Sequence, residues 1–383
     1  MVATSCFNFW SLRRVCAPSD LVQNLKMRFN IYLLLLLGFL THAPSMWANG
    51  TIRLDIRGRR IEGHPLSWTS NNMHLLGRDG TLWSFDPTHV RNMRKISSRF
   101  NSYSSAEMRA GLHQEFGKRF DVSGTGHYLI VHPKGKRNRW ENCFEDFYRS
   151  FVHYFRSRGI QTQNPPFPLV VVVFHKRQDF ERLARADGVH ITQRLLGYYS
   201  STSNRILVYD TGAGKNNARQ WQINSETILH EAAHQSAFNT GIHSRFGSTP
   251  RWLAEGLGTL FEAKGVWDSR TYQQREDRIN RGRLKAFRRH LPNQSADVIA
   301  RIVADDDLFQ RNSDHAYAEA WALTFFLTET EPQKYKQFLQ RTATRKPFTN
   351  YRSVERQKDF ADIFGKDLRM LNARLERFIR TLP

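Results

Sequence analysis

The chain has 383 residues, of which 40% are hydrophobic and 13% aromatic, with 27 phenylalanines and 9 tryptophans. This composition suffices for one large domain, or for a main domain with a small partner, and it excludes an intrinsically disordered chain. The formal net charge of +22 favours anionic partners such as acidic polymers, phospholipid headgroups or nucleic acid, and it does not constrain the fold. Because the basic residues are scattered, a generally basic, solvated surface is a better interpretation than a dedicated groove.

The first 48 residues have the pattern of a targeting segment. Lys26 and Arg28 precede an unbroken apolar run over residues 31–40. This run suits the hydrophobic region of a signal peptide and is short for a membrane span, which needs about 20 residues. We expect residues 1–48 to be a signal peptide or presequence, with Met27 as a candidate true start. The rest of the chain is then exported to the periplasm, the cell envelope or the medium; the alternative is an uncleaved membrane anchor through 31–40.

The three cysteines exclude a disulfide-stapled fold. Cys6 and Cys16 lie in the segment that we expect to be removed, which leaves Cys143 alone. A lone cysteine cannot form an intramolecular bridge, and it cannot build a cysteine-rich zinc site. Cys143 falls on a helical, phenylalanine-rich pattern, where we expect it to be buried and inert.

Residues 49–101 are predicted to form a small β-rich module. The segments TIRLDIRG and TLWSF alternate polar and apolar residues, and an Arg-Asp-Gly turn at 78–80 lies between them. Because it looks separate, this module is the part we expect to bind something other than a substrate, although it contains no binding motif.

Residues 102–383 are predicted to form one α+β domain. Its first part, 102–241, alternates helices and strands, and the apolar run at 168–174 is typical of a buried strand. The expected helices are 105–118, 139–158, 177–186 and 226–239. A further strand is expected at 126–133, and 197–210 is expected to form a strand pair or a bent strand. The second part, 242–383, is mostly helical beyond Pro250.

A metal-binding motif lies inside the last of these helices, at His230-Glu231-Ala-Ala-His234. Histidines at i and i+4 share one helix face, so both ring nitrogens can reach one ion. A catalytic zinc site takes three protein ligands and keeps one position for a water, whose pKa the ion lowers toward 7. Glu231 is placed to take the proton of that water as a general base. We expect one zinc ion per chain, although affinity order alone also admits another divalent ion.

The third ligand is expected on a second helix downstream. Thr249 is a good N-cap and Pro250 a good first residue for a helix that carries Glu255, 21 residues after His234. A carboxylate at this position completes a His2Glu set. Glu262, two turns further on, shares the face of Glu255. It is either the rival ligand, or a surface acid, or a residue that supports the ligands.

These segments resemble the gluzincin-type metallopeptidases, the HExxH…E branch of the peptidase-MA-like zincins. The matching residues are HEAAHQ at 230–235 and PRWLAEGLGTLFE at 250–262, where the W-x-x-E-G pattern of the family supplies the third ligand. The chain is also similar to an uncharacterised family of predicted exported zincins, through GYYSSTSNRILVYD at 197–210 and a YAEAWALTFFL helix. The resemblance covers about residues 102–330. It implies a zincin-like fold, with the metal helix beneath an edge strand of a small sheet and the remaining ligand from a helical subdomain.

Four further residues or segments have competing interpretations. Tyr317 is a candidate hydrogen-bond donor to the oxyanion, as a tyrosine is in several gluzincins, or simply an aromatic residue of a buried helix. The strand at 204–210 is either the edge that binds an extended substrate or an ordinary sheet strand. His243, between the two ligand helices, is a weaker candidate and is better read as a loop residue. Trp252 and Phe261 are expected in the core.

The sequence therefore predicts an exported zinc endopeptidase or aminopeptidase that acts on a polypeptide. The alternative is a zincin-fold protein with weak or no catalysis that binds anionic cell-envelope polymers or membrane headgroups through its positive charge. The intact Glu231 argues against this alternative. No nucleic-acid partner is expected, because the chain has an export signal and no aromatic-plus-basic nucleic-acid motif.

Overall fold

The computed structural model describes residues 50–135, 140–211 and 218–383, without the side chains of 218–225 and Asn293. The predicted signal peptide, the candidate start at Met27 and the alternative anchor at 31–40 lie outside these residues. No helix within the described residues combines the length and apolarity needed to cross a membrane. The fold is mixed α+β, with two five-stranded sheets and many helices.

Two compact units make up the described chain, one from residues 50–78 and 82–101 and the other from 79–81 and 102–383. The smaller unit is an antiparallel sheet with strand order β4-β3-β2-β1-β5. Arg57 and Gly58, both with positive φ, form the two-residue turn between its first two strands. One face carries the apolar core, which includes Ile52, Leu54 and Leu75. The strands are β1 Thr51–Ile56, β2 Arg59–Trp68, β3 Met73–Gly77, β4 Leu82–Phe85 and β5 Val90–Ser97.

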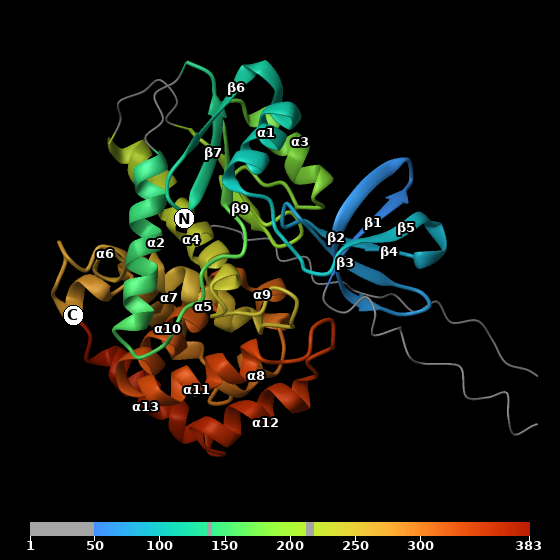
Figure 1. Ribbon diagram of the computed structural model, residues 1–383. Helices are drawn as coiled ribbons and strands as arrows, with labels where there is room; N and C mark the ends of the chain where they lie inside the picture. The colour runs from blue at the N-terminus through green and yellow to red at the C-terminus, as the bar shows by residue number, and fades with distance from the viewer. Residues whose placement is uncertain (1–49, 136–139, 212–217) are drawn as a thin grey trace, which may run out of the picture. The chain divides into compact units, whose positions relative to one another are not determined.

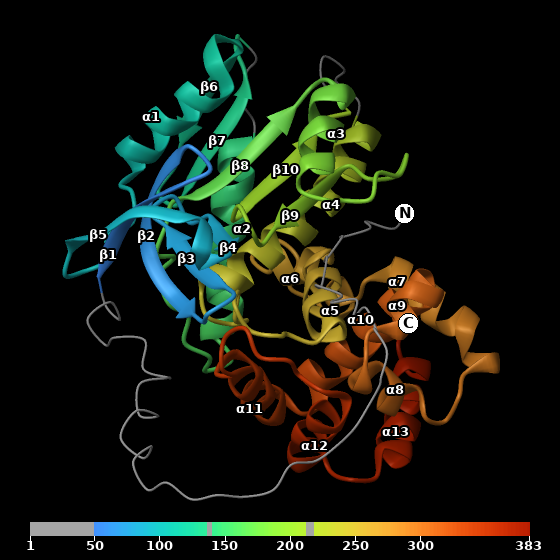
Figure 2. The ribbon, with the colours of Figure 1, turned by 90° about the vertical axis from the view of Figure 1, so that its right-hand side faces the viewer.

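A second sheet, with strand order β6-β7-β8-β10-β9, forms the first half of the larger unit. Its three inner strands are parallel and its two edge strands are antiparallel to their neighbours. Figure 2 shows α1 and α3 on one face and α2 and α4 on the other, which buries every residue of β8. The strands are β6 Phe120–Gly124, β7 Tyr128–Pro133, β8 Leu169–Phe174, β9 Gly197–Ser200 and β10 Arg205–Tyr209. The helices are α1 Ser105–Phe116, α2 Trp140–Arg156, α3 Arg177–Ala186 and α4 Ala218–Asn239.

The strand predicted at 204–210 is an ordinary inner strand. As β10 it pairs with β8 on one side and with β9 on the other, so its backbone has no free edge for a substrate. The prediction of a substrate-binding edge at 204–210 is therefore wrong. The edge strand on this side of the sheet is β9.

The second half of the larger unit is helical and is built around α10, which is apolar on all sides and almost entirely buried (Figure 1). α5 packs closely against α10 because Gly256 has no side chain: a Cβ there would lie 2.1 Å from Thr324 Oγ1. Trp252 and Phe261 of α5 are fully buried, as predicted. The helices are α5 Arg251–Phe261, α6 Lys264–Trp267, α7 Arg281–His290, α8 Val298–Ala304, α9 Asp307–Arg311, α10 Ser313–Thr330, α11 Pro332–Ala343, α12 Ser353–Phe364 and α13 Leu368–Arg380. Short 3-10 helices cover Pro87–His89, Gly117–Arg119, Arg275–Arg278 and Leu291–Asn293.

Two local predictions differ from the structure. α5 begins at Arg251 with Pro250 as its N-cap residue, and the Thr249 hydroxyl is buried without a hydrogen bond, so it caps nothing. A carboxylate from outside the helix replaces it, since Asp306 Oδ1 accepts from the Arg251 backbone N–H at 3.2 Å. Cys143 is half-buried rather than buried; burial of its thiol raises the pKa to about 12, which keeps it protonated.

Candidate metal centre

His230 and His234 lie one turn apart on α4 and are both buried. Their rings meet edge to face, with centroids 4.6 Å apart and the two Nε2 atoms 3.0 Å apart. Neither ring faces the solvent as it would on an exposed helix. The i, i+4 spacing therefore brings two ring nitrogens to one point inside the protein.

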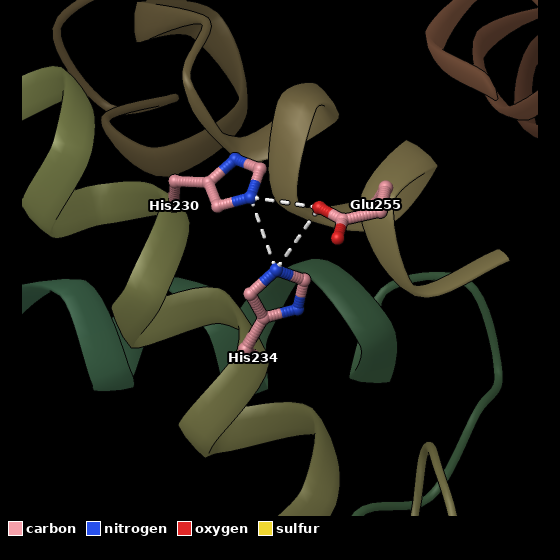
Figure 3. Close-up of side chains that lie close together, drawn as sticks. All are labelled: His230, His234 and Glu255. Carbon is pink, nitrogen blue, oxygen red and sulfur yellow. Dashed lines mark hydrogen bonds and ion pairs between the residues drawn. The ribbon is translucent and has the colours of Figure 1, made fainter. Parts of the chain in front are cut away.

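Glu255 of α5 brings a carboxylate to the same point (Figure 3). Its Oε2 lies 3.1 Å from His230 Nε2 and 3.5 Å from His234 Nε2. The three ligand atoms lie within 4.8 Å of one another, and all three side chains are buried. Zinc–ligand bonds of about 2.0–2.2 Å at tetrahedral angles place two ligand atoms roughly 3.4 Å apart, so the observed spacing fits this ion.

Gly258 makes room for the ring of His230. A Cβ on Gly258 would lie 2.7 Å from His230 Cε1, a distance that packed atoms do not reach. Glycine in the middle of a helix costs about 1 kcal/mol relative to alanine. The close packing of the His230 imidazole against α5 explains why residue 258 is a glycine despite this cost.

Glu262 contacts the other side of the same imidazole. Its Oε1 accepts a hydrogen bond from His230 Nδ1 at 2.9 Å, which directs the Nε2 lone pair toward the ligand point. Asn280 donates to Glu262 Oε2 at 2.7 Å, and the Arg283 guanidinium lies 3.6 Å from Oε1. The ring of His230 thus separates the two candidate carboxylates: Glu255 reaches Nε2, and Glu262 reaches Nδ1. Of the roles considered for Glu262, the geometry fits support of a ligand.

The charges around the centre favour a bound cation. Burial alone would lower the pKa of His230, but hydrogen bonds to Glu255 and Glu262 outweigh it and raise this pKa to about 10. Burial alone would also raise the pKa of Glu255, yet hydrogen bonds from His230 and His234 hold it far below its usual range. In the metal-free protein His230 thus holds a proton between two carboxylates, and the same negative surroundings would suit a bound metal cation. The donor set, two imidazoles and one carboxylate, is the one found in many catalytic zinc sites.

Glu231 follows His230 on α4 and is fully buried. The Tyr199 backbone N–H, on edge strand β9, donates to Glu231 Oε2 at 2.7 Å, while Oε1 has no hydrogen-bond partner among the described residues. Burial raises the pKa of Glu231 to about 8, with the charge of His230 opposing this shift and that of Glu255 adding to it. One oxygen is therefore held in place, and the other is available to exchange a proton.

Tyr317 lies on the α10 side of the centre, with its ring 6.2 Å from that of His230. Its hydroxyl is buried and has no hydrogen-bond partner within the part of the chain that the structure describes. The Arg283 guanidinium lies 5.0 Å from the ring centroid. Burial and the charge of Glu255 raise the Tyr317 pKa well above its usual value, against the charge of nearby Arg251, so the hydroxyl keeps its proton. It is thus a donor without a protein acceptor.

A cavity of about 450 Å³ reaches this region. Its lining includes Glu262, Asn280 and Arg283, which support His230, together with Glu226 and Asp314. Sequence reasoning named Glu262 but missed Asn280, Arg283 and the backbone of Tyr199. The sequence did carry one signal of close packing at this site, the two glycines of the LAEGLGTLF segment, because a glycine inside a helix usually has a packing reason.

A family model and a solved structure are similar to parts of this chain. The model of a family described as "Protein of unknown function (DUF1570)" matches residues 224–349, a segment that holds the HEAAH motif, Glu255 and Tyr317. No curated protein matches the chain. Among solved structures, the chain is similar to a mutant of a two-domain M1 zinc metallopeptidase bound to L-arginine, with 16% identity and a TM-score of 0.35. The match covers 69% of this chain and 52% of that one, so it spans about half the length of that structure.

Proposed function

We propose that this protein is a zinc-dependent peptidase of the gluzincin type, with His230, His234 and Glu255 as the metal ligands. The observation that carries this proposal is the convergence of two imidazole nitrogens and one carboxylate oxygen within 4.8 Å inside the protein. Buried acidic and imidazole groups are costly unless they are paired or bind an ion, and the shared point of these three suits an ion.

Zinc bound at this point would polarise a peptide carbonyl and lower the pKa of a water molecule, as it does in other hydrolases. Glu231 is the general base in this proposal, because its Oε1 has no partner among the residues that the structure describes while Oε2 is fixed by Tyr199 N–H. Oε1 takes a proton from the attacking water, whose oxygen bonds to the carbonyl carbon. Glu231 Oε1 then delivers this proton to the amide nitrogen as the C–N bond breaks, so Glu231 returns to its starting state.

Tyr317 is proposed to stabilise the negative charge on the former carbonyl oxygen. It is a buried, protonated donor near the ligand triad, and its hydroxyl has no acceptor in the described ranges. A donor that finds its acceptor only as the charge develops stabilises the transition state more than the ground state.

A polypeptide is the proposed substrate because the general base is held by the edge strand of the sheet. Tyr199, whose backbone N–H binds Glu231, belongs to edge strand β9. A substrate in extended conformation that adds to β9 would pass close to Glu231. The proposed place of action is outside the cytoplasm, which rests on the sequence of residues 1–48 alone.

The first experiment measures the metal content of the protein without residues 1–48. Elemental analysis should find about one zinc per chain in the wild type. Glu255→Ala should lose most of it. Glu276→Ala, which removes an exposed carboxylate on the rim of the neighbouring cavity, should retain it.

Activity is then measured on a library of internally quenched peptides. The wild type should cleave members of the library, and Glu231→Gln should keep its zinc while losing activity by several orders of magnitude. Absence of zinc in the wild type after incubation with the metal and dialysis would contradict the proposal. Full activity of Glu231→Gln would contradict the role of that residue.

A further inference from the structure

His243 lies just beyond the end of the metal helix. α4 ends at Asn239, and Gly241 reverses the chain with φ of 81°. The His243 backbone N–H then donates to the Ala237 carbonyl at 3.0 Å, which brings the residue back over the last turn of the helix. This geometry places it one turn beyond the HEAAH motif.

The His243 ring continues the row of side chains that contains the metal ligands. It contacts Phe238 at a centroid distance of 5.5 Å, and Phe238 lies one turn after His234 on the same helix face. Phe238 also stacks on Tyr199 of edge strand β9, with ring centroids 5.8 Å apart. The imidazole of His243 therefore lies against Phe238, one turn beyond His234, and near the strand whose Tyr199 backbone N–H binds Glu231.

His243 is buried, and neither of its ring nitrogens has a hydrogen-bond partner within the part of the chain that the structure describes. The other three buried histidines of the described residues all have partners: His132 bonds a backbone carbonyl, and His230 and His234 meet each other and Glu255. A buried imidazole without a partner costs free energy, and in a native protein it calls for an explanation such as a catalytic or binding role, a bound ion or an ordered water. A neutral imidazole offers one N–H donor and one acceptor.

The two simpler roles do not fit this residue. His243 is not in the set of groups that converge on the ligand point, so it is not a fourth ligand. It makes no hydrogen bond to His234, so it does not orient that ligand as Glu262 orients His230. If the His243 side chain only filled space in the core, an apolar ring would serve without the cost of two buried ring nitrogens.

We propose that His243 is a substrate-contacting residue whose ring N–H donates a hydrogen bond to a peptide carbonyl oxygen beside the scissile bond. This inference rests on the proposed peptidase function and adds a contact to the same site. Tyr317 lies on the His230 side of the centre, and His243 lies beyond the His234 side, against Phe238. The two buried donors thus bind different oxygens of one extended polypeptide.

The test replaces His243 by phenylalanine, which keeps the ring contact with Phe238 and removes both nitrogens. The value of kcat/KM on a cleaved peptide should fall about 10- to 100-fold, the usual effect of leaving one hydrogen bond unmade at a site. The zinc content should stay at the wild-type level, and Tm should be unchanged or higher, because the variant buries no unpartnered polar group. His243→Gln, which keeps an N–H donor, should recover part of the lost kcat/KM.

Tyr335→Phe is the matched control. It removes a buried hydroxyl that has no hydrogen-bond partner among the described residues, on α11 and outside the set of groups that converge on the ligand point, and kcat/KM should stay at the wild-type value. Unchanged kcat/KM in His243→Phe would overturn the proposal. A loss of kcat/KM that follows a lower zinc content or a lower Tm would also overturn it, since His243 would then have a structural role.

A binding measurement separates failure of this inference from failure of the proposed function. A peptide that ends in a hydroxamate is titrated against the zinc-loaded Glu231→Gln protein with His243 intact or replaced by phenylalanine. Binding several-fold weaker in the double variant supports the contact even if the wild type cleaves no peptide. Equal binding overturns the contact, and no binding to either protein overturns both the contact and the peptidase function.

Discussion

Replacing Glu262 by glutamine tests how the second carboxylate contributes to the metal centre. The substitution keeps an oxygen that can accept from His230 Nδ1, now 2.9 Å from Glu262 Oε1, but it removes the charge. Hydrogen bonds to charged groups contribute about 1.5–3 kcal/mol and neutral ones about 0.5–1.5 kcal/mol. The midpoints of these ranges differ by about 1.3 kcal/mol, which corresponds to a roughly tenfold weaker zinc Kd, at the lower end of the 10- to 100-fold effects seen for such supporting residues.

The same change should also reduce stability. Arg283 is 5% exposed, and Glu262 is its only ion-pair partner among the described residues. Breaking a fully buried ion pair costs about 3–5 kcal/mol. Here we expect about 1–3 kcal/mol, because the charges are 3.6 Å apart and the Glu262 side chain is 14% exposed.

Competition with a chromogenic zinc chelator gives the Kd, and urea unfolding of the metal-free protein gives the stability. Glu276→Gln is the control, because Glu276 lines the same cavity but is exposed and makes no contact with His230. Glu255→Gln should weaken zinc binding more than Glu262→Gln, since it alters a direct ligand. The reverse order would refute our assignment and would make Glu262 the third ligand. Equal affinity in Glu262→Gln and Glu276→Gln would refute the supporting role.

Three further predictions concern packing and protonation. Gly258→Ala should weaken zinc binding at least about tenfold without any change of charge, because the new Cβ displaces the His230 ring; chelator competition measures this, and wild-type affinity would contradict it. Gly256→Ala should lower the unfolding free energy by about 1–3 kcal/mol through overpacking against Thr324, and unchanged thermal unfolding would argue against tight contact of α5 and α10. With a folded pKa of about 10 against an ordinary value of 6.5, protonated His230 stabilises the metal-free protein fully below pH 6.5, and this contribution is lost as pH rises through 10. Urea unfolding after chelator treatment should therefore show falling stability between these pH values, a trend that His230→Gln should lack, and zinc uptake in this range should release a proton in calorimetry.

The identity of the third ligand illustrates the limit of the sequence. Glu262, the C-cap residue of α5, follows Glu255 by seven residues, close to two full helical turns, so both lie on one side of this helix. Helical periodicity alone cannot separate them. The structure separates them because the ring of His230 enters between α4 and α5 at Gly258, with Nε2 toward Glu255 and Nδ1 toward Glu262.

The sheet edge was also undecided by the sequence. Residues 205–209 and 197–200 are both short apolar strands, and alternation does not reveal which one has a neighbour on both sides. Parallel pairing of β10 with β8 depends on residues 169–174, a contact far along the chain, and it leaves β9 outermost.

The amino-acid sequence by itself determined the features that depend on local periodicity. An i, i+4 spacing places His230 and His234 on one helix face wherever that helix lies, and a fully apolar β-branched run makes 169–174 a buried strand. The tertiary structure alone decided which side of each imidazole meets which carboxylate, which strand is the edge, and which buried donors lack acceptors. These features depend on distances between segments far apart in the chain, and local spacing does not encode such distances.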